Sequence, residues 1–169
     1  MKRINFLIDD VGASQLAYYL LSQLNVLVRE HNDICPTVFY SSLTDHCVKP
    51  IEFNLMMMVE AFDHPGPTVA TSLPTAGRLI TMPRPSPKIF YVWDLEWMRF
   101  ANIQWSSVRR IIEHPDLHLV ARSLSHKQAI EQCFDKKVEA IVNDCNMNDM
   151  LAFIEECGGI EYGIHERAS

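Results

Sequence analysis

The chain has 169 residues, of which 48% are hydrophobic, with a formal net charge of −6 at pH 7 and a pI near 5.6. This size suits a single domain around one core, and an acidic chain without a basic tract is unsuited to non-specific binding of nucleic acid or an anionic membrane. The sequence also has no apolar run near the roughly 20 residues that span a bilayer.

The cysteines and the N-terminal run indicate a compartment. The five cysteines are odd in number and lack a CxxC pair. The first apolar run, 4–8, meets Asp9 and Asp10, so it is typical of a strand and not of a secretion signal. We therefore expect a cytoplasmic protein with reduced thiols, and neither a metal site nor a cofactor.

Short apolar runs alternate with amphipathic stretches along the chain. Strands are predicted at 4–8, 37–42, 68–72, 88–93, 117–123 and 137–142. Helices are predicted at 14–31, 51–62, 75–80, 103–113, 125–134 and 147–159.

Capping residues support several of these helices. Ser14 is the predicted N-cap of the first long helix, Pro74 suits a first helical turn, and Ser125 with Gln128 forms a predicted capping box. Repeated strand–helix units predict an α/β fold, a single Rossmann-like doubly wound domain at 1–159 with a mostly parallel six-stranded sheet. Residues 160–169 are expected to form a loosely attached tail.

Polar residues follow most of the predicted strands. In doubly wound sheets, ligands bind beyond the carboxyl ends of the strands, near the point where strand order reverses. The candidates there are Asp9, Asp10, Gly12, Thr71, Ser72, Asp94, Glu96, Arg122, Ser123, Asn143 and Asp144.

The segment Trp93-Asp94-Leu95-Glu96-Trp97 carries two acids between two indoles at a strand end. In an extended segment the acids share one face and the tryptophans the other. One hypothesis makes Asp94 and Glu96 catalytic, as a general base or as hydroxyl-binding acids, with Trp93 and Trp97 as a stacking wall for a sugar or base. The alternative is that the indoles fill the core and the acids remain in solvent.

The other candidates also allow two interpretations. Gly12 either makes a tight turn or lets the next helix contact phosphate, and Asp10 either binds ligand or caps a loop. Arg122 can fork onto a phosphate at the sheet edge. His126, after Ser123, either binds an anion or acts as a base, or is simply an exposed helix-start histidine.

Three stretches carry a resemblance to a known family. They are "VATSLPTAGRLI", "KIFYVWDLEW" and "LHLVARSLSHKQAIEQCFDKKVEAIVND". In order and spacing they resemble the N-terminal half of retaining, glycogen-synthase-like GT-B glycosyltransferases, with Thr71-Ser72, Ala121-Arg122-Ser123 and Val142-Asn143-Asp144 at the family's motif positions. "LIDDVGASQLAYYL" and "FYVWDLEW" also resemble small proteins of T4-like cyanophages that are labelled glycosyltransferase, which would place the chain in a host cytoplasm. The likeness spans most of 4–155.

The resemblance implies an acceptor-side domain that transfers or binds a sugar, with the donor half supplied by a partner. It implies that Asp94 and Glu96 contact acceptor hydroxyls, that the Gly12 loop faces the donor phosphate and that Arg122 assists with charge. The chain departs from the family pattern in its single glycine, Gly12, and in Asp144 where the family has glycine. The expected ligands are a nucleotide sugar or a sugar acceptor, with a protein partner or a homo-oligomer. The alternatives are a non-catalytic binding or assembly module and a small nucleotide-binding regulator.

Overall fold

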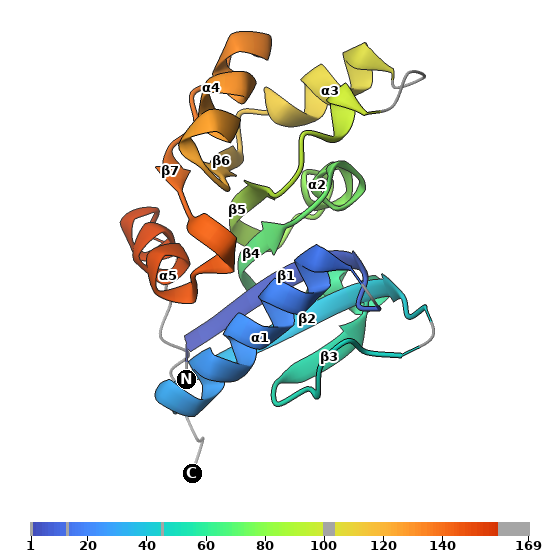
Figure 1. The fold of residues 1–169 in the computed structure, drawn as a ribbon, viewed down its shortest axis with the longest axis vertical. Coiled ribbons are helices and arrows are strands. Elements are labelled where there is room, and N and C mark those ends of the chain that lie inside the picture. The colour runs from blue at the N-terminus through green and yellow to red at the C-terminus, as the bar shows by residue number, and fades with distance from the viewer. Residues whose placement is uncertain (1, 13, 45, 100–103, 159–169) are drawn as a thin grey trace.

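The computed structural model describes residues 2–12, 14–44, 46–99 and 104–158, and the predicted tail at 160–169 lies outside them. Within these residues the fold is α/β, with one sheet of seven parallel strands in the order β3-β2-β1-β4-β5-β6-β7 (Figure 1). The predicted Rossmann-like, doubly wound class is confirmed.

The strands alternate with helices along the chain. The strands are β1 (Lys2–Asp10), β2 (Ile34–Ser42), β3 (Asn54–Met57), β4 (Gly66–Ala70), β5 (Pro85–Val92), β6 (Leu117–Ala121) and β7 (Ala140–Ile141). The α-helices are α1 (Gln15–Glu30), α2 (Leu73–Leu79), α3 (Trp105–Ile112), α4 (Leu124–Cys133) and α5 (Met147–Glu156). Short 3₁₀ turns are η1 (Met58–Asp63), η2 (Glu96–Met98) and η3 (Asn143–Cys145).

The extra strand lies where a helix was predicted. Segment 51–62 forms β3 and then η1, so the predicted helix is wrong and the sheet has seven strands instead of six. Leu55 pairs with Val38 of β2 in parallel register. Pairing with an existing strand outweighs the local preference of this methionine-rich run, because strand preference depends strongly on neighbours.

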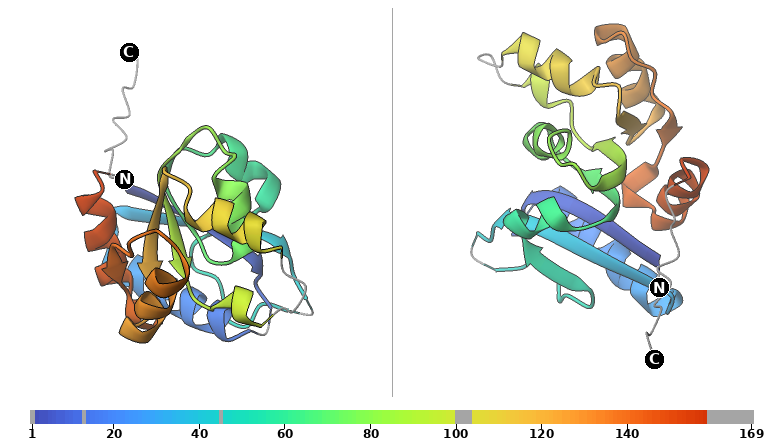
Figure 2. Two further views of the ribbon diagram at one scale, coloured as in Figure 1. Left: turned by 90° about the horizontal axis from the view of Figure 1, so that it is seen from above. Right: turned by 180° about the vertical axis from the view of Figure 1, so that it is seen from behind.

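Both faces of the sheet are covered. Helices α1 and α5 pack on one face, and α2, α3 and α4 pack on the other (Figure 2). Phe6 and Ile8 of β1 point into the first core, whereas Leu7 points into the second. This alternation is the period of two expected for a strand buried on both faces. None of the helices in the described part of the chain is long and apolar enough to cross a membrane.

Side-chain caps begin four of the described helices, α1, α2, α4 and α5. The hydroxyl of Ser14 accepts the N–H of Ala17, which confirms the predicted cap of α1, and Pro74 lies in the first turn of α2 as predicted. Helix α4 is capped by Ser123, not by Ser125. Strand β6 ends at Ala121, so Ser123 is the residue in extended conformation at the helix start.

Strand order reverses beside β1. The chain runs from β1 outward to β2 and β3, and then returns to β4 on the other side of β1. In such sheets the crevice at this switch point, beyond the carboxyl ends of the strands, is the usual ligand position. The predicted site residues follow these strand ends.

Candidate functional site

Asp10, at the end of β1, organises the loops beside it. Its Oδ1 accepts the backbone N–H of Gly12 at 2.5 Å and that of Thr44 at 3.3 Å. Its Oδ2 accepts the hydroxyl of Ser42 at 2.9 Å and the hydroxyl of Thr44. The Thr44 hydroxyl and the Gly12 N–H stabilise the charged carboxylate and lower the pKa of Asp10 to about 2. Asp10 therefore acts as a structural anchor between the loops after β1 and β2.

Only glycine fits at position 12, beside Asp10 and Thr44. A Cβ at this position would lie 2.5 Å from the carbonyl oxygen of Thr44 and 2.7 Å from Asp10 Oδ1. Both distances are far below van der Waals contact, so any side chain here displaces the loop. The single glycine is accounted for by close approach of two loops, and its N–H is already bound to Asp10.

Ser72 connects β1 to the start of α2. It is the N-cap of α2 and forms a reciprocal capping box with Thr75. Its hydroxyl also donates to Asp9 Oδ2 at 2.5 Å. Because β1 and β4 are neighbours, this bond lies directly at the switch point.

Glu96 extends the acidic edge from β5. The turn η2 brings its Oε1 to 2.9 Å from the N–H of Leu73, the first residue of α2. Burial raises the pKa of Glu96 above its ordinary 4.5, the Leu73 bond opposes this shift, and the charges of Asp9 and Asp94 add to it. Asp94 forms a 2.7 Å ion pair with Arg99 and keeps about a third of its side chain exposed. Carboxylates from two strand ends therefore meet beside the switch point.

The two tryptophans lie in different cores, which corrects the prediction that they share one face. Trp93 belongs to the core under α1 and α5, where its ring lies 5.7 Å from that of Tyr19. Trp97 belongs to the opposite core and meets Phe134 edge-on at 5.1 Å. The chain is not extended through this segment, because it turns into η2 at Glu96.

Neither indole is open to a ligand. Trp93 is 7% exposed and Trp97 is 5% exposed. The guanidinium of Arg122 already lies over the Trp93 ring, 3.9 Å from its centroid. Trp97 Nε1 is buried without a hydrogen-bond partner among the described residues. The expected stacking wall for a sugar or base is therefore absent from the described edge. The indoles fill the core, as the alternative predicted, but Glu96 does not remain in solvent as that alternative also expected, because it is half-buried and bound to Leu73.

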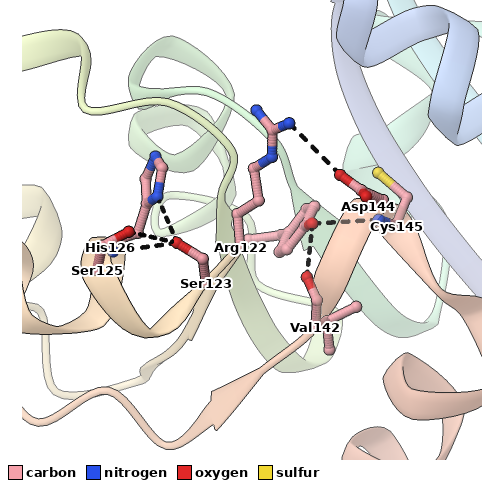
Figure 3. A network of polar contacts seen from close by, with 8 residues as sticks. Arg122, Ser123, Ser125, His126, Val142, Asp144 and Cys145 are labelled. Carbon is pink, nitrogen blue, oxygen red and sulfur yellow. Dashed lines mark hydrogen bonds and ion pairs between the residues drawn. The ribbon is translucent and has the colours of Figure 1, made fainter.

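Arg122 is held from two sides. One face of its guanidinium contacts Trp93, and its Nη2 lies 3.4 Å from Asp144 Oδ1 (Figure 3). Asp144 and the next residue, Cys145, have positive φ angles of 45° and 58°. The Tyr91 hydroxyl fixes this turn, because it donates to the Val142 carbonyl at 2.8 Å and accepts the Cys145 N–H at 3.2 Å.

His126 lies beside Arg122 in the first turn of α4. Its Nδ1 is 2.8 Å from the Ser123 hydroxyl, which also contacts Ser125 Oγ at 2.9 Å. Burial and the positive charge of Arg122 lower the pKa of His126, while Asp94 opposes this shift. The imidazole is therefore neutral at pH 7, and Figure 3 shows its other nitrogen pointing away from Ser123.

The strand-end rule found most of the residues at this edge but missed Tyr91 and Thr44. Tyr91 lies within β5, where the sequence shows only a buried strand. A signal was present, because a buried tyrosine hydroxyl needs a hydrogen-bond partner. The partnership of Thr44 with Asp10 depends on the meeting of two loops distant in sequence and had no local signal.

The carboxyl edge is distinct from a cavity at the opposite edge. That cavity, of about 350 Å³, lies between the end of α1 and the starts of β2 and β3; its lining includes His31, Cys35, Glu52 and Asn54. Within residues 2–12, 14–44, 46–99 and 104–158, no group of three His, Cys, Asp or Glu side chains could hold a metal ion. All five cysteines are free.

Comparison with family models, curated proteins and solved structures gave no match to this chain. The glycosyltransferase resemblance stays a prediction. Function must therefore be inferred from the side chains at the carboxyl edge.

Proposed function

We propose that the carboxyl edge of the sheet binds a sugar acceptor, and that the chain takes part in glycosyl transfer with a donor-binding domain supplied by a partner. The observation that supports this is the convergence of Asp9, Asp94 and Glu96: the Leu73 N–H binds Glu96, the adjacent Ser72 hydroxyl binds Asp9, and Asp94 lies two residues before Glu96. Burial raises the pKa of Glu96, and the nearby charges of Asp9 and Asp94 raise it further. Ionised carboxylates are acceptor-only groups, so they suit a ligand with several hydroxyl donors.

Asp94 and Glu96 have different roles in this proposal. Asp94 is the more available acid, because its only described ion pair is with the exposed Arg99. It accepts the proton of the acceptor hydroxyl while that oxygen bonds to the anomeric carbon of the donor sugar. The bond from this carbon to the phosphate oxygen breaks, and the nucleoside diphosphate leaves. Glu96 uses Oε1 for Leu73 and keeps Oε2 for a second hydroxyl.

The donor phosphates are assigned to the partner and not to the Gly12 loop. Helix N-termini bind phosphate through free N–H groups. Here the Gly12 N–H is bound to Asp10 and the Leu73 N–H is bound to Glu96. A phosphate at these N–H groups would also lie directly against the carboxylates of Asp10 and Glu96, and like charges repel.

Because these N–H groups are already bound and are not available to a donor phosphate, they also favour a second candidate, a non-catalytic binding or assembly module. An exposed apolar patch supports it as well. Met57 of the edge strand β3 is 48% exposed, and Val59 and Phe62 of η1 are 71% and 42% exposed. Large exposed apolar side chains that gather in one place are typical of interaction surfaces.

Mapping by NMR tests the proposal. Titration of the full ¹⁵N-labelled chain with glucose, galactose and mannose should shift amide resonances around Asp9, Ser72, Asp94 and Glu96. Shifts confined to other regions, or none with any sugar, would contradict it. Release of nucleoside diphosphate from a nucleotide sugar, on addition of the sugar that binds and a donor-domain chain, separates the transferase from the binding module.

A further inference from the structure

We infer that the ligand at this edge carries an anionic group, a phosphate or a carboxylate, which Arg122 binds with the help of His126. The inference rests on the proposed function for the sugar part of the ligand. The anionic part rests on the contacts of Arg122 and His126.

Arg122 is held in position, but its contacts with the described residues do not use all of its N–H donors. The Trp93 ring supports one face of the guanidinium, which limits its motion without using its N–H groups. Its one described ion pair, to Asp144, is a single contact at 3.4 Å. Strong arginine–carboxylate pairs form two parallel bonds at roughly 2.7–2.9 Å, so this pair leaves donors unused. A guanidinium held flat with unused donors suits a planar or tetrahedral anion.

The turn that carries Asp144 is strained. Positive φ angles at two consecutive residues that are not glycine are unfavourable for L-amino acids, and the buried Tyr91 hydroxyl maintains them here. The turn places the Asp144 carboxylate beside Arg122. Because that carboxylate is more than half exposed, an incoming anion can displace it at small cost.

His126 completes the anion site. Figure 3 shows Arg122 and the imidazole of His126 projecting to the same side of the end of β6. Burial lowers the pKa of His126, and the nearby charge of Arg122 lowers it further. The nitrogen of His126 that faces away from Ser123 can donate a hydrogen bond to the anion. Asp94 acts on the same imidazole from β5, so the anion site adjoins the hydroxyl-binding acids.

The test compares probes that differ only in charge. Glucose, glucose 6-phosphate, glucuronate and inorganic phosphate are titrated into the full chain, with the ring signals of His126 followed by NMR. The charged sugars should bind at least about tenfold more tightly than glucose, the gain expected from one charge-assisted bond. Whichever of glucose 6-phosphate and glucuronate binds more tightly identifies the anion as phosphate or carboxylate. Binding should also raise the His126 pKa, because the anion offsets Arg122.

Variants assign the effect to Arg122. Arg122→Gln should abolish the preference for charged sugars, whereas the matched control Arg110→Gln, on an exposed residue of α3, should keep it. Asp144→Asn should strengthen anion binding several-fold, because it removes the competing carboxylate and asparagine tolerates the left-handed backbone. Asp149→Asn, an exposed acid of α5, should change nothing. If Arg122→Gln fails to fold, the anion affinity of Asp144→Asn tests the inference instead, and an affinity equal to that of the wild type would contradict it.

The outcomes distinguish the inferred anion site from the proposed sugar site. Equal affinity for glucose and the charged sugars, or an unchanged preference in Arg122→Gln, overturns the anion site and leaves the proposed function in place. Inorganic phosphate binding as tightly as glucose 6-phosphate, with glucose not bound, supports the anion site and overturns the sugar site. Failure of every probe to bind overturns both.

Discussion

Glu96 accepts a 2.9 Å hydrogen bond from the backbone N–H of Leu73, so a side chain that follows β5 caps the helix that follows β4. The bond joins two neighbouring strand ends and directs one carboxylate oxygen inward. It also brings Glu96 toward Asp9 and Asp94, whose charges oppose its ionisation. Burial is the main cause of the raised Glu96 pKa, and these charges add to it, so the Leu73 bond holds Glu96 where its ionised form is disfavoured.

The first prediction follows from the raised pKa of Glu96. A carboxyl with a folded-state pKa above 4.5 stabilises the fold below pH 4.5, and this contribution is lost as the pH rises through the folded value. Glu96→Gln keeps an acceptor for Leu73 without the charge. The variant should exceed the wild type in free energy of unfolding at pH 7, by less than about 2 kcal/mol, and the gap should close near pH 3.5.

Urea unfolding at both pH values checks this prediction. Glu60→Gln, an exposed glutamate of η1, is the control and should show no such gap. A loss of stability in Glu96→Gln at pH 7 that disappears near pH 3.5 would contradict the prediction, because it would show that the fold favours the ionised carboxylate.

The second prediction concerns Asp10, whose pKa is lowered to about 2, mainly by the Thr44 hydroxyl and the Gly12 N–H. Its contribution to stability is present above pH 3.8 and is lost as the pH falls through about 2. Asp10→Asn should cost about 1 kcal/mol at pH 7, after allowance for the partial exposure of the loop. Denaturation curves should converge with the wild type as the pH approaches 2, and a constant difference would refute the assignment.

Gly12→Ala gives the third prediction. The added methyl group meets the Thr44 carbonyl at 2.5 Å, so the substitution should cost roughly 1–3 kcal/mol. Gly77→Ala is the matched control. Its nearest new contact is the flexible Ile111 side chain at 3.2 Å, and alanine favours the helix, so thermal stability should stay near the native value. Equal melting temperatures for both variants would mean that the loop yields freely.

The fourth prediction tests the buried hydroxyl of Tyr91. Tyr91→Phe leaves the Cys145 N–H and the Val142 carbonyl without this partner and should cost about 1–3 kcal/mol. Tyr18→Phe, at a ring that is 45% exposed, should be nearly neutral. Calorimetric unfolding measures both. A neutral Tyr91→Phe would show that the turn at Asp144 holds without this bond.

Strand periodicity and strand-end position predicted much of this architecture. The runs at 4–8 and 37–42 lie in β1 and β2, the run at 117–123 contains β6 and extends two residues past its end, and the acids at 94 and 96 follow β5 as expected. The helix predicted at 51–62 is wrong, because β3 exists only through its pairing with β2, which the sequence does not show. The run at 137–142 formed strand only at Ala140–Ile141.

The sequence predicted which residues lie at the strand ends, but not how their side chains are arranged. That Asp94 and Glu96 gather at one edge follows from parallel strands. That Trp93 and Trp97 enter opposite cores follows from η2, a turn that the extended-segment assumption missed. Likewise, both Ser123 and Ser125 are good caps, and only the end of β6 at Ala121 selects Ser123.

The affinity of a neutral sugar for acid variants of the full chain tests the central claim most directly. Calorimetric titration with the sugar mapped by NMR should give at least about tenfold weaker binding for Asp94→Asn and for Glu96→Gln, because each removes a charged acceptor. Asp116→Asn, an exposed acid before β6, should bind as the wild type does. Asp94 pairs with Arg99 near the surface, so melting temperatures should stay within a few degrees of the native value. Undiminished affinity in both folded acid variants would contradict a sugar site at this edge.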